Sequence, residues 1–264
     1  MKIRTTLVLF SLALFAACST VALTGRKQLT LLPSSQMLSL ASDNYDTVLN
    51  QNKISENEAY ISMVRNAGSR VSNAVEQYMS ENGMESRISN YEWEFNVLAS
   101  DKVNAWCMPG GKIAFYEGIM PICRDETGVA VVMAHEIAHA VARHGNERLS
   151  QQLTLQLGGM ALSEALEKEK ETTQQLAMLA FGLGTQLGVV LPYSRTHEKE
   201  ADEMGLYFAA MAGYDPREAI EFWERMKQQG GARVPEFLST HPHPETRIRK
   251  LKDLMPEAMK YYER

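Results

Sequence analysis

One helical segment constrains this chain more than any other. The apolar run 129–134 leads directly into a His-Glu-x-x-His motif formed by His135, Glu136 and His139. Two histidines four positions apart lie on one face of an α-helix, so both imidazoles can reach one metal ion. Because an unpaired buried carboxylate costs several kcal/mol, Glu136 in such a helix is poorly explained as ordinary core packing.

The same spacing indicates what the glutamate does. Glu136 lies about 100° around the helix from His135, beside a bound metal, where a general base for the attacking water is needed. A catalytic zinc also needs a third protein ligand and an open position. A metzincin would have Gly at position 142 and a ligand at 145, but the chain has Ala142 and Gly145, so that class is excluded.

The third ligand is expected in a second predicted helix far downstream. Glu198 and Asp202 share a helix face, which suits a metal-binding carboxylate followed one turn later by an acid that orients a ligating histidine. The alternative is an exposed charged face, and Lys199 and Glu200 fit that description. His197 is a rival ligand, although no partner at a ligand spacing supports it.

Three motifs in order resemble the zinc metallopeptidase family of HtpX, BepA and the CAAX prenyl endopeptidases, which are gluzincins of metallopeptidase family 48. The motifs are HEIAHA from His135, SRxxExEAD from Ser194, and Ser-Thr-His-Pro at 239–242 followed by Arg247. The resemblance covers roughly residues 104–251. It implies a mainly α fold with a small β-sheet (α+β) and a gluzincin-type active-site helix.

The resemblance also implies a set of ligands. His135, His139 and Glu198 would bind one Zn²⁺ per chain, and Glu136 would be the general base. Asp202 would accept a hydrogen bond from a ligating histidine.

Two further residues match the HPxxxxR pattern of this family. His241 and Arg247 would lie over the metal and stabilise the oxyanion. For His241 the resemblance leaves a second role open, in which it caps the metal in a resting state.

Three short strands are predicted ahead of the motif helix. Alternating apolar and polar residues over 91–97 predict one, and residues 103–108 and 112–116 flank a Pro-Gly-Gly turn. The stretch beginning at Val103 resembles the family's edge strand. This implies that Asn104, Ala105 and Trp106 bind an extended peptide mostly through its main chain.

The rest of the chain reads as helix. Helical periodicity covers 34–82, one helix is expected over 125–147, and breaks are expected at 213–216 and 230–231. Residues 176–191 are strongly apolar but number only sixteen and include three glycines. They are too short to span a bilayer comfortably, so a buried or cleft-lining helix is predicted.

The N-terminus has the pattern of an export signal. Lys2 and Arg4 precede a short apolar run, and two alanines then precede Cys18, which resembles a bacterial lipobox. The pattern predicts removal of residues 1–17 and lipidation of Cys18. An ordinary secretory signal, in which Cys18 is incidental, is the alternative.

That signal sets the expected organisation and location. Residues 1–17 form the signal peptide, 18–35 a lipid-anchored tether and 36–264 the metallopeptidase domain. The expected location is the cell envelope, on the outer membrane facing the periplasm.

Composition and charge limit the classes of binding partner that the chain is expected to have. The chain has 264 residues, 45% of them hydrophobic, which suffices for a globular core. The net charge is −5, and no basic tract with interleaved aromatics appears, so nucleic acid is not an expected partner. Cys107 and Cys123 are predicted either as a disulfide or as two buried thiols.

The predicted function follows from the motifs and the resemblance together. It is zinc-dependent endopeptidase activity on envelope proteins in extended conformation, particularly misfolded or unassembled ones. The alternative is a zinc-stabilised periplasmic chaperone or assembly factor that needs no proteolysis. Intact Glu136 argues against a purely structural zinc, which would also prefer four closed ligands.

Overall fold

The computed structural model describes residues 18–229 and 235–263 and divides the chain into two compact units. Unit 1 combines the described residues up to Ser34 with the segment Arg143–His197. Unit 2 combines Ser35–Ala142 with the described residues from Glu198 onwards. The predicted domain 36–264 is therefore interrupted in the structure by residues that pack with the N-terminal segment.

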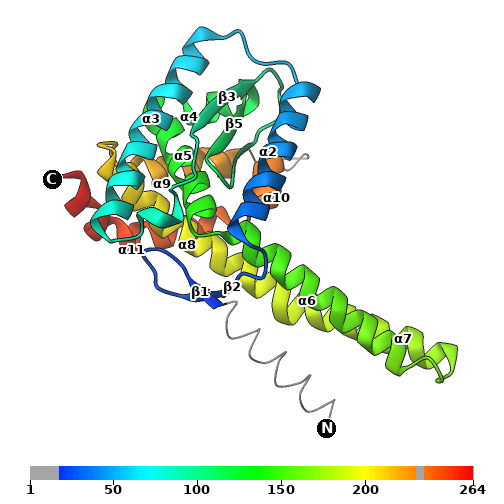
Figure 1. Cartoon of the computed structure of the whole chain (residues 1–264). Coiled ribbons are helices and arrows are strands. Elements are labelled where there is room, and N and C mark those ends of the chain that lie inside the picture. The colour runs from blue at the N-terminus through cyan, green and yellow to red at the C-terminus, as the bar shows by residue number, and fades with distance from the viewer. Residues whose placement is uncertain (1–17, 230–234, 264) are drawn as a thin grey trace. The chain divides into compact units, whose positions relative to one another are not determined.

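Unit 2 contains a three-stranded sheet in the order β3-β5-β4 (Figure 1). β3 (Glu94–Leu98) runs parallel to β5 (Lys112–Tyr116), and β4 (Ala105–Met108) runs antiparallel to β5. The three predicted strands thus form the expected small sheet, and its parallel β3–β5 pairing is a feature that the strand patterns did not specify. β4 is an edge strand, and the helix carrying the His-Glu-x-x-His motif packs beside it.

Two helices form most of the core of unit 2. α3 (Glu58–Glu81) buries its valine stripe and is capped by Asn57, whose side chain accepts from the Tyr60 N–H. α5 (Glu126–Val141) begins at Asp125, whose carboxylate accepts from the Gly128 N–H. Nearly all side chains of α5 are buried, as its apolar sequence predicts.

Two predicted helices are broken in the structure. The periodic region 34–82 forms α2 (Ser34–Gln51) and α3, separated by a link in which Ile54 makes an isolated bridge to Leu98. The helix predicted over 125–147 ends as α5 at Val141, because Arg143 adopts a left-handed conformation with φ of 61°. Neither break has the glycine or proline that would have indicated it.

The remaining elements of unit 2 are short or C-terminal. α8 (Leu191–Met211) belongs to unit 2 from Glu198 onwards, and the break after it, at Gly213, is confirmed by a φ of 78°. The break predicted at 230–231 lies outside the described residues. The other elements are η1 (Glu85–Arg87), η2 (Glu117–Ile119), α4 (Met120–Cys123), α9 (Glu218–Gln228), α10 (Glu236–Thr240) and α11 (Pro244–Tyr262).

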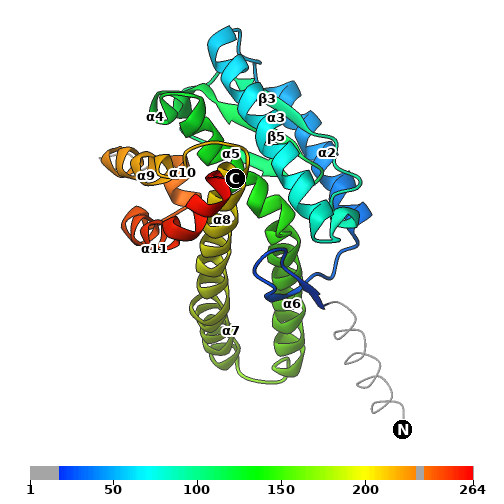
Figure 2. The ribbon, with the colours of Figure 1, turned by 90° about the vertical axis from the view of Figure 1, so that its left-hand side faces the viewer.

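Unit 1 pairs a β-hairpin with two long helices. β1 (Cys18–Thr20) and β2 (Lys27–Leu29) are antiparallel, and α6 (His144–Ala165) lies beside α7 (Glu171–Thr185), as Figure 2 shows. The Leu31 N–H donates to Ser150 Oγ at 2.8 Å, and Asn146 donates to the Leu32 carbonyl at 2.8 Å. The described part of the predicted tether is thus fixed to α6.

One helix of the chain is unusually apolar. α7, the π-helical segment η3 (Gln186–Val190) and α8 form one continuous helix over Glu171–Met211. Among the described residues, only this helix is long and apolar enough to cross a membrane, with a mean hydropathy of 1.5 over an 18-residue window. None of that window is buried, so the prediction of a buried or cleft-lining helix at 176–191 is wrong.

A candidate metal centre

Four helices of unit 2 contribute to one cluster of polar side chains. His135 and His139 come from α5, and Glu198 comes from α8. His241 directly follows α10, and Arg247 lies in the second turn of α11. The structure therefore brings together residues that are up to 112 positions apart.

The cluster has the dimensions of a metal site. His135, His139, Glu198 and His241 each offer one ligand atom, and these atoms all lie within 4.8 Å of one another. A tetrahedral zinc with bonds of 2.0–2.1 Å would require ligand atoms about 3.3 Å apart. The two Nε2 atoms of His135 and His139 are 3.1 Å apart, and Glu198 Oε1 is 3.4 Å from His139 Nε2. This donor set of three imidazoles and one carboxylate fits zinc.

His241 lies among the ligand atoms rather than apart from them. Its Nδ1 is 3.2 Å from His135 Nε2 and 2.8 Å from Glu198 Oε2. Its Nε2 lies 3.4 Å from Glu136 Oε1, and its ring packs on Phe237 at 4.5 Å between centroids. Of the two roles left open for His241, this arrangement fits the resting-state cap.

Asp202 and Arg247 support the cluster from behind. Asp202 Oδ1 is 3.3 Å from His135 Nδ1, the nitrogen opposite the one that faces the cluster. Arg247 donates to Asp202 and, at 2.9 Å, to Glu198 Oε2, and its guanidinium stacks on Trp223 at 3.7 Å. Arg247 thus binds both carboxylates, whereas the prediction placed it over the metal, where it would stabilise an oxyanion.

Glu136 is the buried acid that these contacts leave available. Its side chain is almost completely buried, and Oε1 accepts no hydrogen bond. Burial raises the pKa of this carboxyl above its ordinary value. A buried acceptor without a partner, 3.4 Å from a histidine of the cluster, fits a site that binds a water or a substrate group.

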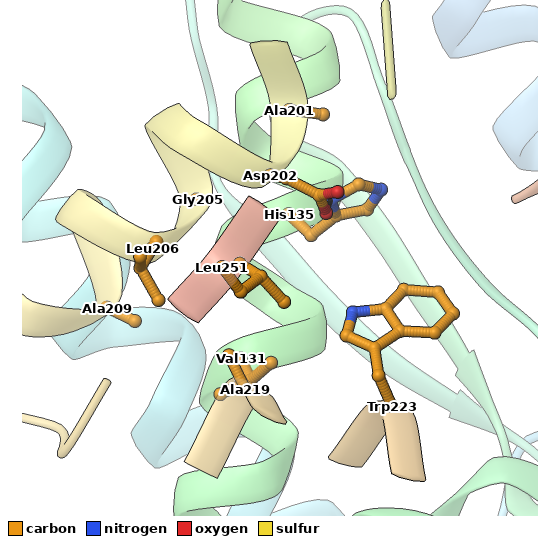
Figure 3. Close-up of a pocket in the computed structure, with 10 residues that line it drawn as sticks. All are labelled: Val131, His135, Ala201, Asp202, Gly205, Leu206, Ala209, Ala219, Trp223 and Leu251. Carbon is orange, nitrogen blue, oxygen red and sulfur yellow. Dashed lines mark ion pairs between the residues drawn. The ribbon is translucent and has the colours of Figure 1, made fainter. Parts of the chain in front are cut away.

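The two helices that carry the site approach each other at a glycine. A Cβ on Gly205 of α8 would lie 2.9 Å from the backbone N and Cα of His135. Gly205 also lines a small cavity, of about 20 Å³, beside Asp202 and Trp223 (Figure 3). The close crossing is what places Glu198 and Asp202 opposite the α5 histidines, and no motif or periodicity in the sequence marks Gly205 as the residue that allows it.

This crossing leads to a prediction. Gly205→Ala would gain about 1 kcal/mol of helix propensity, but its Cβ must push α8 away from the His135 backbone. We therefore expect weaker zinc binding, on the order of 10–100-fold, as when groups that orient metal ligands are altered. A competition titration with a zinc chelator measures this. Gly182→Ala is the matched control, because no other part of the described chain, apart from its own helix backbone, lies within 4 Å of its Cβ position. Equal affinities in both variants would contradict the prediction.

The edge strand differs in detail from its prediction. Asn104 is buried, donates to Glu236 Oε1 at 3.2 Å and accepts from the Ala105 N–H at 3.0 Å. The Trp106 ring packs edge-on against Tyr45. The Tyr116 N–H donates to the Asn104 carbonyl, so this carbonyl points toward β5. In an antiparallel pair, every second residue points its N–H and C=O away from the partner strand. On β4 these residues are Ala105 and Cys107, whose main-chain groups face the open edge.

His197 has a different environment from the cluster. Its Nε2 lies 2.8 Å from Glu147 Oε2 within unit 1, and Arg26 also pairs with Glu147 at 2.6 Å. Although burial alone would raise it, hydrogen bonds from Arg26 and His197 lower the pKa of Glu147 to about 2. The rival ligand is thus part of an ion-pair network. Glu200, expected on an exposed face, is buried, whereas Lys199 is exposed as predicted.

The two cysteines of unit 2 are free thiols. Burial raises the pKa of both Cys107 and Cys123. Of the two predicted alternatives, a disulfide or two separate thiols, the structure has the separate thiols.

Comparison with known proteins supplies independent information. The model of Peptidase family M48 matches residues 68–255. Mitochondrial metalloendopeptidase OMA1 of Schizosaccharomyces pombe is 37% identical over 190 residues, which cover 71% of this chain and 53% of that protein. Human metalloendopeptidase OMA1, mitochondrial, is 29% identical over 266 residues, covering 97% and 49%. The Escherichia coli beta-barrel assembly-enhancing protease is 29% identical over 161 residues, covering 59% and 33%.

These relatives correct the predicted location. Six of the similar proteins are named as mitochondrial, which contradicts the expectation of a bacterial outer-membrane lipoprotein facing the periplasm. The basis of that expectation, residues 1–17, lies outside the described residues, so cleavage and lipidation at Cys18 stay predictions. The chain spans about half the length of the OMA1 proteins from yeasts and animals that it matches.

Proposed function

The chain belongs to peptidase family M48, and we propose that it is a zinc-dependent metalloendopeptidase acting on protein segments in extended conformation. The observation that carries the proposal is the convergence of three imidazole nitrogens and one carboxylate within 4.8 Å, next to the buried Glu136. Names of the relatives, which include several metalloendopeptidases, support it.

In this proposal His135, His139 and Glu198 hold the zinc ion. When bound, the ion supplies a Lewis acid that polarises the scissile carbonyl and makes the attacking water more acidic. Asp202 Oδ1 lies 3.3 Å from His135 Nδ1 and would accept a hydrogen bond from it, which would leave Nε2 as the unprotonated nitrogen that binds metal. Arg247 orients Glu198 and Asp202 together, because it donates to both.

Glu136 is assigned the proton transfers. Its Oε1 has no hydrogen-bond donor, so it can accept a proton from the attacking water. Burial raises the pKa of this carboxyl, which makes it a stronger base than an exposed glutamate, and the proton that it takes up would then pass to the leaving amine.

His241 is assigned to the fourth position of the cluster. Its Nδ1 lies 3.2 Å from His135 Nε2 and 2.8 Å from Glu198 Oε2, close enough for all three atoms to bind one metal ion. His241 can therefore close the site when no substrate is present. Since it is carried by the residue after α10 rather than by α5 or α8, it can withdraw without displacing the other three ligands.

The substrate is assigned to the open edge of β4. An extended chain can pair with the outward main-chain groups of Ala105 and Cys107, and β4 packs beside α5. Asn104 then acts by fixing the start of α10 through Glu236, and Trp106 by packing on α2. Recognition through the main chain suits unfolded proteins of many sequences, which favours a role in the removal of misfolded or unassembled proteins.

A non-catalytic chaperone is the second candidate, because the same open edge would bind unfolded segments without cleaving them. The two candidates differ in one experiment. Purified full-length protein is incubated with unfolded casein and the products are identified by mass spectrometry. We expect new internal cleavage sites that disappear with a zinc chelator and return when zinc is added. Intact casein that stays bound to the protein would instead support the chaperone.

A further inference from the structure

The helices of unit 1 contain two long runs without charged side chains. Thr172–Ser194 comprises 23 such residues within one continuous helix, and Leu149–Ser163 comprises 15 in α6. At 1.5 Å per residue these runs are about 35 Å and 22 Å long, against about 30 Å for the hydrocarbon core of a bilayer. The uncharged run in this helix is therefore longer than the sixteen strongly apolar residues at 176–191.

The packing of this helix pair is the reverse of that in a water-soluble bundle. Where α6 meets α7, Phe181 lies over Gly158 and Gly159. The large aliphatic side chains point outwards instead, at spacings of three and four residues that align them along each helix. They are Leu149, Leu153, Leu157 and Met160 on α6, and Leu176, Leu179, Leu183 and Leu187 on α7 and η3, with exposures from 37% to 68%.

Such an arrangement is typical of helices in lipid. In a bilayer, small residues let two helices approach, while leucines face acyl chains at no cost. In water, a monomeric protein seldom exposes a contiguous apolar surface of this extent.

The charges complete the pattern. Exposed Arg148 and Arg195 immediately flank the two uncharged runs at the end of the hairpin where α6 begins, and such positions suit anionic headgroups. The opposite end is the turn around residues 164–171, whose ionisable side chains are all exposed. The hairpin is thus uncharged along its length and charged only at its ends.

We propose that the α6–α7 hairpin inserts its exposed leucines into the hydrocarbon region of a lipid bilayer. The proposal is independent of Cys18 and of the proposed peptidase activity, because it rests on residues 148–195 alone. Membrane contact would place the protein where membrane-bound or membrane-emerging chains can serve as its substrates.

A local probe tests the insertion. Leu179→Trp is made in the full chain, which is mixed with vesicles of phosphatidylcholine and phosphatidylglycerol whose acyl chains carry bromine, a contact quencher of indole. The unsubstituted protein emits from Trp93, Trp106 and Trp223, and its spectrum is subtracted from that of the variant, which leaves the emission of the added tryptophan. We expect the added emission to shift to shorter wavelength and to lose most of its intensity. Lys252→Trp, at an exposed position on α11, is the matched control and should show neither change.

The probe reports insertion whether or not the N-terminal segment also binds the vesicles. Leu183→Trp repeats the measurement at a second position, in case the first substitution disturbs folding. Added emission that stays at long wavelength and unquenched in both variants would overturn the proposal. A shift to shorter wavelength without vesicles, together with a doubled mass in solution, would also overturn it, because a second copy of the chain would then cover the leucines.

Discussion

Replacing Glu136 by Gln is expected to reduce the rate of protein cleavage by about 10²–10⁴-fold, the contribution typical of a positioned general base. The amide has the same shape as the carboxylate but cannot accept the proton of the attacking water. None of the four ligand atoms of the cluster is changed, so one zinc per chain should remain. Cleavage of fluorescently labelled casein and metal analysis of the same preparation measure both quantities.

The control for this substitution is Glu221→Gln, which makes the same chemical change at an exposed position of α9. It should retain full activity. If Glu136→Gln cleaved casein at the rate of the parent while bound to zinc, Glu136 would not be the base. If it lost the metal, its role would lie in holding the site together.

The second large effect is expected from Glu198→Gln. Glu198 presents Oε1 to His139 and Oε2 to His241, so its charge is directed at the centre of the cluster. We expect zinc affinity to fall by more than the roughly 10–100-fold that follows loss of an orienting partner, and activity to fall with it. Chelator competition measures the affinity, and circular dichroism confirms that the variant is folded.

Folding should survive this change, because Asp202 still pairs with the buried Arg247. Glu203→Gln, the same change at a half-buried acid further along α8, is the matched control and should bind zinc like the parent. A folded Glu198→Gln protein with unchanged zinc affinity would remove Glu198 from the ligand set.

The motif helix could be predicted from the sequence because it depends on local geometry. His135 and His139 share a face by helix periodicity alone, and the apolar residues before them predict burial. The three strands were equally accessible, since alternation and a Pro-Gly-Gly turn are local signals, but the parallel pairing of β3 with β5 is not local and was not predicted. Glu198 is different: the helix face that it shares with Asp202 and the family resemblance both pointed to it, but nothing in the 58 intervening residues fixes its distance from His139.

Features that arise from tertiary packing were missed. The approach of α8 to His135 needs Gly205, but a glycine within a helix has no local signal that reports a close crossing. The break at Arg143 uses a left-handed residue other than glycine, which sequence patterns rarely reveal. Arg247 matched an oxyanion-binding pattern, yet its distance to Asp202 and Trp223 could come only from the fold.

The apolar hairpin was misread for a physical reason. Hydropathy identifies side chains that avoid water, but it does not distinguish a protein core from lipid. Only the exposure of Leu176, Leu179 and their neighbours in the structure separates the two environments.

The central claim is that one zinc ion in the cluster of His135, His139 and Glu198 carries the hydrolysis. The most direct measurement is a titration of zinc into metal-free full-length protein while casein cleavage is followed. The account predicts no cleavage at the start and a linear rise that saturates at one zinc per chain. Cleavage by the metal-free protein, or none at full zinc occupancy, would contradict it.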